Sequence, residues 1–325
     1  MWLIIITLLL IALELVYFRV AERFNIIDEP NLRSSHKSIS LHGGGIIFLL
    51  GAWLFWLCFG FQYSWFILGL TLVGVVSFVD DIHSLPNTLR LVVQFTAMFL
   101  LFGQLGILNL NDWWMALVGL IVCVGIVNAY NFMDGINGIT GGYSLAVLLP
   151  LIYLNRTMDF ISMDYLYVTG ISLLIFCFFN FRKKAKCFAG DVGSITIAFI
   201  LLFPLGKLIL HTGNFAFIVF LAVYGADSVL TILHRIKLHE NLGLAHRKHA
   251  YQLMANELKL SHPTVSIIYM ALQLLISAGI IFLPINNYIY LGLVIVALAA
   301  AYIFFMKKYY HLHEEYLMGL NRTTK

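Results

Sequence analysis

Acidic side chains recur at the ends of strongly apolar segments in this chain. Asp80 and Asp81 follow one such segment in the string FVDDIHSLP, and Asp191 opens another in FAGDVGS. Adjacent carboxylates at a membrane interface resist ionisation unless a cation neutralises them, so a positive group is expected beside Asp80 and Asp81. Mg²⁺ binds one or two carboxylates together with phosphate oxygens, which suits Asp191 at a helix start whose N–H groups would face a phosphate. The alternatives are a solvated acid pair and a helix cap.

Amide side chains and glycines gather in the string NAYNFMDGING, between two apolar segments. Glycine lets a ligand approach the backbone closely, and free N–H groups suit a phosphate or the edge of a nucleobase. A polar hairpin between helices is the alternative, but it would not require so many amides. The predicted substrate-binding residues here are Asn128, Asn131, Asp134, Gly135 and Asn137.

Histidines and cations are concentrated in loop 235–262. His246 and His249 are three residues apart, so on a helix they would share one face, with Arg247 beside them. Arginine offers a planar fork of donors and histidine can donate from both nitrogens, so these three residues are predicted to bind a diphosphate. A zinc site is less favoured because no Cys, Asp or Glu stands at ligand spacing. Attraction to anionic lipid headgroups is the alternative.

Two further features are less specific. The string PNLRSSHK, which ends in Lys37, precedes Gly43-Gly44-Gly45. It predicts either substrate contact, with Lys37 as the candidate, or a basic loop followed by close helix packing. Asp227 lies inside an apolar segment and is a functional candidate for that reason, whereas Glu14 is not favoured.

The elements that must position these residues are membrane-spanning helices. Of the 325 residues, 61% are hydrophobic and only 11% are charged, which excludes an ordinary soluble fold. The four cysteines are scattered and predict neither zinc nor a disulfide framework. The first segment lacks signal-peptide features and is expected to be retained. We therefore predict an all-α polytopic membrane protein of one domain (1–325), with about eleven spans at 2–18, 43–61, 63–79, 89–103, 112–128, 138–155, 163–179, 193–210, 214–234, 264–283 and 287–306.

Basic residues set the orientation. Eighteen of the twenty Lys and Arg residues fall on one face of this topology, which predicts a cytoplasmic C-terminus and an N-terminus outside. Asp80 and Asp81, Asp134, and Asp191 are separated by two spans each, and two crossings return the chain to the same face. The acids are therefore expected to converge on the cytoplasmic surface, in an active site formed by loops of about 19–42, 80–88, 128–138, 180–192 and 235–262.

These motifs together resemble the polyprenyl-phosphate N-acetylhexosamine-1-phosphate transferase family. The resemblance rests on GGG, FVDD, NxxNFMDGxNG, GDVGS and the late HRKH loop, in family order over nearly the whole chain. PNLRSSHK, FVDDIHSLP and AHRKHAYQ look closest to the branch that initiates O-antigen or capsule synthesis. Two strings depart from the family: Asn137 stands where a second Asp is common, and HRKH replaces a compact triple-His motif, which argues against the muramoyl-pentapeptide branch.

The resemblance implies roles for these residues. Asp80 would deprotonate or position the lipid phosphate, Asp81 would support it, and both would be catalytic together with Asp191. Asp191 would bind Mg²⁺, with Asp81 as a second metal candidate and Mn²⁺ as an alternative ion. Asn131, Asp134 and Gly135 would line the nucleotide pocket, and Asn180 would add a contact. His246 and His249 would lie near the diphosphate.

The implied activity is transfer of N-acetylhexosamine 1-phosphate from a UDP-sugar to undecaprenyl phosphate in the bacterial cytoplasmic membrane, with release of UMP. Direct attack by the lipid phosphate is favoured over an aspartyl-phosphate intermediate. The expected partners are the two substrates and membrane lipids, with no nucleic acid; a homodimer is left open. A transporter would predict acids at mid-membrane and inverted repeats, and a scaffold would leave the acids and amides at helix ends unexplained.

Overall fold

The computed structural model describes residues 2–28, 40–108, 113–243 and 246–323. All eleven apolar segments predicted to span the membrane are helical, and Lys37 lies outside the described residues. The spans correspond to α1 Trp2–Arg23, α2 Ile46–Cys58, α3 Ser64–Ile82, α4 Asn87–Leu105, α5 Trp113–Met133, α6 Ile139–Met158, α7 Met163–Asn180, α8 Gly190–Thr212, the 3-10 helix η2 Phe215–Leu221 continuing as α9 Ala222–Lys237, α11 His262–Phe282 and α12 Asn287–Thr323.

Nine helices of the described chain are long and apolar enough to cross a membrane. The helix α2 is apolar but has only 13 residues, and α6 is not among the nine. The predicted class, an all-α polytopic membrane protein, is therefore confirmed, and nine of the eleven predicted spans meet the length and apolarity that crossing requires.

Three short elements lie outside the spans. The helix α10 (Ala250–Asn256) follows the HRKH string, and β1 (Ile27–Asp28) pairs antiparallel with β2 (Ser40–Leu41). Leu41 of β2 also forms a bridge to Cys187, just before α8. This small sheet fastens the loop after α1 to the start of α8.

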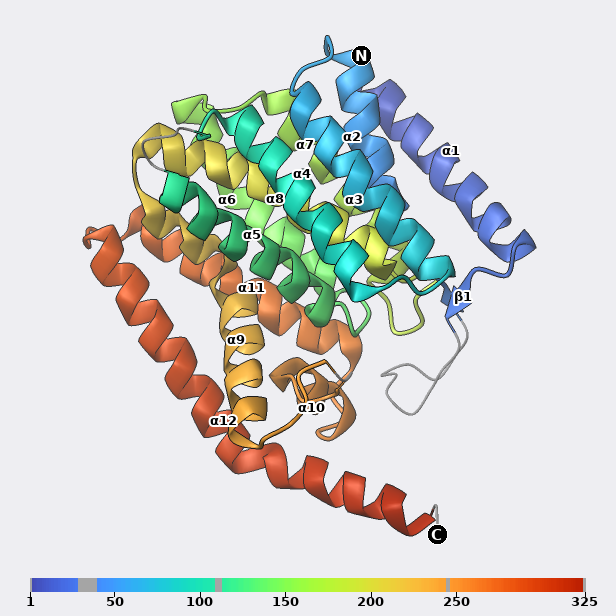
Figure 1. Cartoon of the computed structure of the whole chain (residues 1–325), viewed down its shortest axis with the longest axis vertical. Coiled ribbons are helices and arrows are strands. Elements are labelled where there is room, and N and C mark those ends of the chain that lie inside the picture. The colour runs from blue at the N-terminus through green and yellow to red at the C-terminus, as the bar shows by residue number, and fades with distance from the viewer. Residues whose placement is uncertain (1, 29–39, 109–112, 244–245, 324–325) are drawn as a thin grey trace.

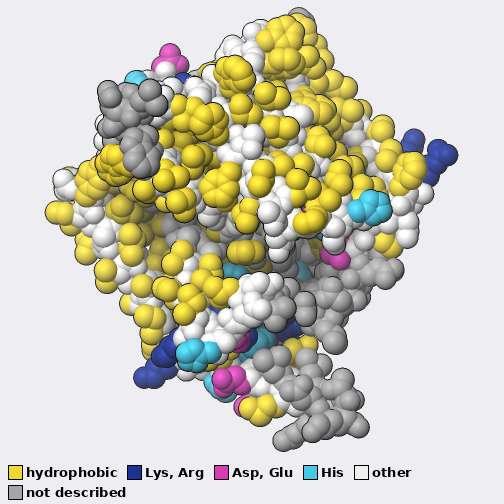
Figure 2. Space-filling model, in the orientation of Figure 1, with side chains coloured by type: hydrophobic (Ala, Val, Ile, Leu, Met, Phe, Trp, Pro, Cys, Tyr) yellow, Lys and Arg dark blue, Asp and Glu magenta, His cyan; other side chains and the backbone are white. Residues whose placement is uncertain are grey.

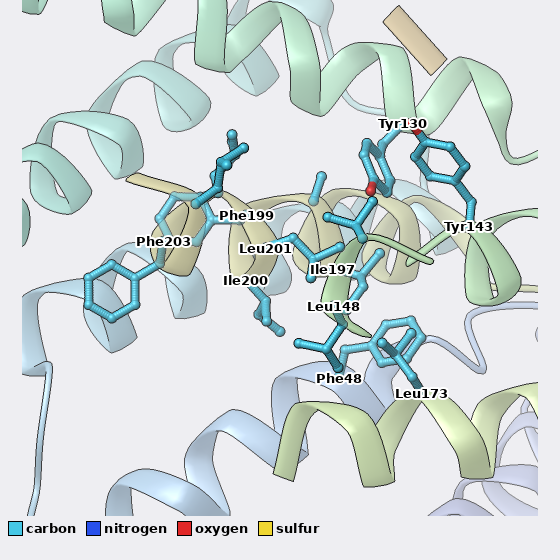
Figure 3. Close-up of a cluster of buried hydrophobic side chains, with 14 of the residues drawn as sticks. Phe48, Tyr130, Tyr143, Leu148, Leu173, Ile197, Phe199, Ile200, Leu201 and Phe203 are labelled. Carbon is cyan, nitrogen blue, oxygen red and sulfur yellow. The ribbon is translucent and has the colours of Figure 1, made fainter. Parts of the chain in front are cut away.

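The helix α8 is the centre of the bundle (Figure 1). In its most apolar window 83% of the residues are buried, against 11% in α12, whose apolar side chains face outward. Buried aliphatic and aromatic side chains from α2, α5, α6 and α7 surround α8, among them Phe48, Tyr143 and Leu173 (Figure 3). The first turn of α8 is thereby held in a fixed place.

Small residues let α2 approach α8 where both helices begin. A Cβ added to Gly45 would lie 2.2 Å from the Cα of Gly193, so neither position has room for a side chain. The predicted close packing at the glycine triplet is therefore found.

The visible face of the molecule is mainly hydrophobic, while charged and histidine side chains gather near α10 and the adjoining ends of α9 and α12 (Figure 2).

Candidate active site

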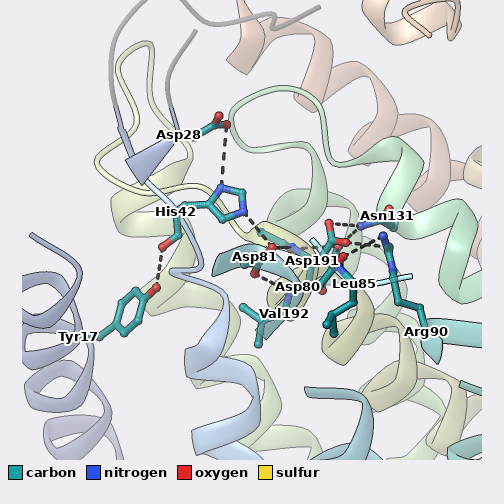
Figure 4. Close-up of polar contacts among 12 residues, drawn as sticks. Tyr17, Asp28, His42, Asp80, Asp81, Leu85, Arg90, Asn131, Asp191 and Val192 are labelled. Carbon is teal, nitrogen blue, oxygen red and sulfur yellow. Dashed lines mark hydrogen bonds and ion pairs between the residues drawn. The ribbon is translucent and has the colours of Figure 1, made fainter. Parts of the chain in front are cut away.

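Two carboxylates contact one guanidinium at the end of α3 and the start of α8, and a third carboxylate, that of Asp81, lies beside them. Arg90, in the first turn of α4, lies 2.8 Å from Asp80 through Nη1 and 2.8 Å from Asp191 through Nη2 (Figure 4). The second oxygen of Asp80 accepts a hydrogen bond from the backbone N–H of Leu85 at 2.6 Å. The predicted convergence of these acids, and the predicted cation beside them, are both present.

Asp81 is committed to the N-terminus of α8. Its two carboxylate oxygens accept hydrogen bonds from the backbone N–H groups of Asp191 and Val192, at 2.8 and 3.0 Å. These are N–H groups that a helix cannot satisfy internally, and a carboxylate there also complements the helix dipole. The expectation that this helix start faces a phosphate is therefore wrong for these two N–H groups, because Asp81 already occupies them.

His42 supplies a second positive charge. Its Nε2 lies 2.9 Å from Asp81, while Nδ1 lies 4.0 Å from Asp28. Burial alone would lower the pKa of His42, but the hydrogen bond to Asp81 and the charges of Asp81 and Asp28 outweigh it and raise that pKa to about 9. His42 is therefore a cation at neutral pH.

The amide segment contributes unequally to this cluster. Asn131 donates from Nδ2 to Asp191 at 2.7 Å and to Ser194 at 3.2 Å, so it belongs to the carboxylate site. Asn128 instead donates to Gln94 at 2.8 Å and ties α5 to α4. The predicted role of Asn131 in a nucleotide pocket stays a prediction, as does that of Asn128.

Asp134 lies on the loop between α5 and α6. It accepts a hydrogen bond from Thr140 at 2.6 Å. Burial raises the pKa of Asp134 to about 7, and the hydrogen bond from Thr140 opposes that rise. A carboxyl with that pKa can hold or release a proton at neutral pH.

Two other predicted residues hold the surrounding loops. Asn137 donates to the carbonyls of Arg182 and Lys183, at 2.9 and 3.2 Å. Asn180 accepts from the N–H of Gly138 at 2.7 Å and donates to the carbonyl of Cys187 at 2.8 Å. These contacts give Asn137 and Asn180 structural functions, whether or not they also contact substrate.

Asp227 anchors the loop that carries His246 and His249. His249 Nδ1 lies 3.3 Å from Asp227, which also accepts hydrogen bonds from Ala250 N–H at 3.1 Å and the Tyr269 hydroxyl at 2.6 Å. Asp227 thus fixes the start of α10, which accounts for this intramembrane acid without a transport path. The His246 ring packs 5.0 Å from that of His249.

Arg247 points away from His246 and His249. It forms an ion pair with Glu257 at 3.1 Å, and its guanidinium lies over the ring of Tyr316 on α12. The two histidines lie side by side as expected, but not on a helix, because α10 begins after His249. Arg247 does not join them, so the predicted grouping of the three residues is not found.

One tyrosine connects the histidine loop to the amide segment. Tyr251 of α10 donates from its hydroxyl to the carbonyl of Phe132 at 2.9 Å. Its ring lies so close to Gly135 that a Cβ there would be 2.2 Å from the hydroxyl oxygen. Gly135 is therefore required for close packing of the protein itself.

Arg90 and His42 were not singled out as site residues by sequence analysis. Arg90 follows Asp80 across a short loop between antiparallel helices, a spacing that identifies it as a candidate partner. His42 is 39 residues before Asp81, with α2 and most of α3 between them, so the packing of the helices brings them together.

The oxygen-rich cluster suits a hard divalent cation. Asp80 and Asp191 already direct one oxygen each at a single cationic group, and Mg²⁺ commonly uses one or two carboxylates plus substrate phosphates. In residues 2–28, 40–108, 113–243 and 246–323, no three His, Cys, Asp or Glu side chains form a complete metal site by themselves. The protein would thus supply part of the coordination shell.

Comparison with known proteins decides the class of this site. A model of glycosyl transferase family 4 matches residues 63–205, which include Asp80, Arg90, Asn131 and Asp191. The chain contains a glycosyl transferase family 4 domain. The resemblance inferred from the motifs is confirmed, and the family 4 domain holds every side chain of the carboxylate cluster except His42.

Relatives of the family 4 domain include enzymes with different named substrates. The chain is 30% identical to the phospho-N-acetylmuramoyl-pentapeptide-transferase of Thermotoga maritima over 178 residues, which are 49% of this chain and 57% of that protein. It is 25% identical to the probable undecaprenyl-phosphate N-acetylglucosaminyl 1-phosphate transferase of Bacillus subtilis over 276 residues, covering 78% of this chain and 76% of the other. With the undecaprenyl-phosphate alpha-N-acetylglucosaminyl 1-phosphate transferase of Escherichia coli K12 the identity is 26% over 211 residues, 58% of this chain and 56% of that one.

The chain thus spans little more than half the length of the Thermotoga and Escherichia relatives. The relatives named here are phospho-sugar transferases, and the described part of this chain has the helices of a multi-pass membrane protein. Because relatives of two branches appear, the predicted O-antigen or capsule branch stays a prediction.

Proposed function

We propose that this protein transfers N-acetylhexosamine 1-phosphate from a UDP-sugar to undecaprenyl phosphate, with release of UMP. The observation that carries the proposal is the pair Asp80 and Asp191, held on one cationic group inside the family 4 domain. The named activities of the Bacillus and Escherichia relatives support the same pair of substrates.

The charges of the site suit a reaction between two phosphates. A lipid phosphate is already anionic at neutral pH, so the protein must chiefly align it and offset the accumulating negative charge. Arg90 and His42 provide positive charge, and Asp80 and Asp191 would hold Mg²⁺, with Mn²⁺ as the alternative ion. When bound, the cation would neutralise phosphate oxygens.

The hydrogen bonds of Asp80 favour direct attack by the lipid phosphate over a covalent aspartyl intermediate. One oxygen of Asp80 is paired with Arg90 and the other accepts from the Leu85 N–H. Both oxygens of Asp81 are likewise occupied at the start of α8. Attack by Asp80 or Asp81 would cost the carboxylate its hydrogen bonds to backbone N–H groups, and this makes both acids weak nucleophiles.

The site is proposed to face the cytoplasm of a bacterial inner membrane. The loops that surround it carry most of the Lys and Arg residues, and such loops remain on the cytoplasmic side. UDP-sugars are cytoplasmic, so this orientation gives the donor access. The product would initiate a cell-surface glycan, with O-antigen or capsule favoured by the HRKH string.

The experiment is a transfer assay with purified protein, Mg²⁺ and undecaprenyl phosphate. UDP-N-acetylglucosamine, UDP-N-acetylgalactosamine and UDP-N-acetylmuramoyl-pentapeptide are each supplied with a label in the sugar. We expect label from one of the first two donors to enter the lipid fraction with equimolar UMP, and EDTA to stop it. Use of the muramoyl-pentapeptide alone would refute the proposed donor class, and no lipid-linked label from any donor would refute the activity.

A further inference from the structure

Arg90 joins two acids that belong to different helices. Its guanidinium lies 2.8 Å from Oδ2 of Asp80 at the end of α3 and 2.8 Å from Oδ2 of Asp191 at the start of α8. The side chain is 24% exposed, so this pairing is not sealed in the protein core. The Asp80 side chain is 8% exposed and that of Asp191 is 26% exposed, so the pair is open to solvent mainly on the side of Asp191.

The oxygens that Arg90 contacts are those that a divalent cation would use. A cation coordinated by both carboxylates would have to approach each oxygen to about 2.0–2.1 Å for Mg²⁺. A guanidinium at hydrogen-bonding distance from the same oxygens takes one lone pair of each and repels the ion. Because the two cations repel each other at this distance, binding of one at these oxygens is expected to weaken binding of the other.

We propose that Arg90 competes with a divalent cation for Asp80 and Asp191, and that the displaced guanidinium becomes a ligand for substrate phosphate. The inference rests on the proposed metal-assisted transfer and adds a role for Arg90 to it. Arg90 would thus pair with the carboxylates of Asp80 and Asp191 in the absence of the cation and with substrate phosphate in its presence.

The Arg90 side chain has both polar and apolar neighbours beside the two carboxylates. It forms part of the wall of a small open pocket between α3 and α4, together with Ser77 and Gln94, and the rest of the wall is formed by Val73, Val76, Val93 and Ile195. The planar fork of arginine suits two phosphate oxygens as well as two carboxylates. An apolar wall beside a cation also suits a lipid phosphate, which carries both kinds of group.

Charge balance favours this exchange. Asp80, Asp81 and Asp191 face two protein cations, Arg90 and His42. A divalent ion added to this set leaves an excess of positive charge, and an anionic phosphate then restores neutrality. Metal and phosphate are therefore expected to bind cooperatively, with Arg90 as the group that couples them.

The test measures Mn²⁺ affinity by electron paramagnetic resonance on the purified full chain, without any transfer reaction. Removal of the competing charge in Arg90→Gln is expected to tighten Mn²⁺ binding about five- to tenfold relative to wild type. Arg156→Gln, an exposed arginine in the last turn of α6, is the matched control and should match wild type. An unchanged or weaker affinity in Arg90→Gln would overturn the proposal, because it would mean that Arg90 only orients the carboxylates.

Dodecyl phosphate provides a second measurement that does not depend on the fold of Arg90→Gln. It should tighten Mn²⁺ binding to wild type, and Arg90→Lys, which keeps the charge without the fork, should show a smaller gain. Equal gains in the two proteins, or none in wild type, would overturn the proposal. A wild type that behaves as expected here but transfers no sugar would refute the proposed function and leave the exchange at Arg90 standing.

Discussion

The carboxylate of Asp81 accepts a hydrogen bond from the backbone N–H of Asp191, over a distance of 2.8 Å. The last turn of α3 thereby fixes the first turn of α8, and with it the side chain of Asp191. The two acids are 110 residues apart in sequence. This contact makes Asp81 a positioning residue for the carboxylate cluster.

Replacing Asp81 with alanine should destabilise the start of α8. The change removes both acceptors of the Asp191 and Val192 N–H groups, and loss of an N-terminal helix cap costs about 1–2 kcal/mol. Thermal unfolding in detergent measures the effect. Glu315→Ala, at an exposed position on α12, is the control and should change stability little. Equal melting temperatures of Asp81→Ala and wild type would contradict the capping role.

Gly190→Ala should lower the free energy of unfolding more than Gly213→Ala, although both glycines have a positive φ. Gly190 has φ +72, and its added Cβ would lie 2.6 Å from Oδ2 of Asp81 and 3.0 Å from the Cα of Gly43. Gly213 has φ +63 but nothing within 4 Å of an added Cβ. Gly213→Ala therefore reports the backbone strain alone, about 1–2 kcal/mol. Similar losses of unfolding free energy in the two variants would show that the contact with Asp81 is unimportant.

Gly135→Ala should be partly rescued by a change in Tyr251. The added Cβ would lie 2.2 Å from the Tyr251 hydroxyl oxygen and at least 3.1 Å from its ring carbons. Tyr251→Phe removes that oxygen and loses the hydrogen bond to Phe132, at a cost of about 1 kcal/mol. A double-mutant cycle of unfolding free energies should give a coupling of at least about 0.5 kcal/mol in favour of the double variant. If the losses of the two single variants simply add in the double variant, the strain of Gly135→Ala does not come from the Tyr251 hydroxyl.

His246 should make the protein sensitive to acid. Burial first, and then the neighbouring charges of His249 and Arg235, lower the pKa of His246 to about 3, against 6.5 for an ordinary histidine. Below pH 6.5 the unfolded chain therefore binds a proton that the folded protein refuses, and stability falls with pH until about pH 3. His246→Gln should lose less melting temperature than wild type between pH 7 and pH 5. Equal losses of melting temperature in the two proteins would contradict the lowered pKa of His246.

Asn180→Ala separates a structural role from substrate contact. The change leaves the Gly138 N–H and the Cys187 carbonyl buried without their partner, at a cost of about 1–3 kcal/mol. We expect a lower melting temperature and, in protein that remains folded, a KM for the UDP-sugar close to that of wild type. A large rise in KM without loss of stability would support the nucleotide contact implied by the family resemblance.

The helices and the meeting of the acids could be predicted from sequence because both follow from simple rules. A long apolar run must be helical in lipid, and two crossings return Asp134 and Asp191 to the face that holds Asp80. Interfacial carboxylates without a nearby cation would be costly, so a positive partner was also predictable. Arg90 fulfils that prediction.

The partners of individual side chains could not be predicted, because they depend on packing between helices distant in sequence. Asp81 and Asp191 are both aspartates at helix ends, yet Asp81 caps the start of α8 whereas Asp191 pairs with Arg90. The start of α10 after His249, fixed by Asp227, likewise decides that Arg247 points to Glu257. No periodicity in loop 235–262 contains that information.

The account depends most on Asp80 and Asp191 acting together in phosphosugar transfer. The most direct measurement is the rate of UMP release by purified Asp80→Asn and Asp191→Asn, at saturating Mg²⁺, UDP-sugar and undecaprenyl phosphate. Asp164→Asn, in the first turn of α7, is the matched control. We predict that each site variant loses at least about a hundredfold in rate, or about 2.7 kcal/mol of barrier, while the control keeps the wild-type rate. Near-normal turnover in both folded site variants would contradict the account.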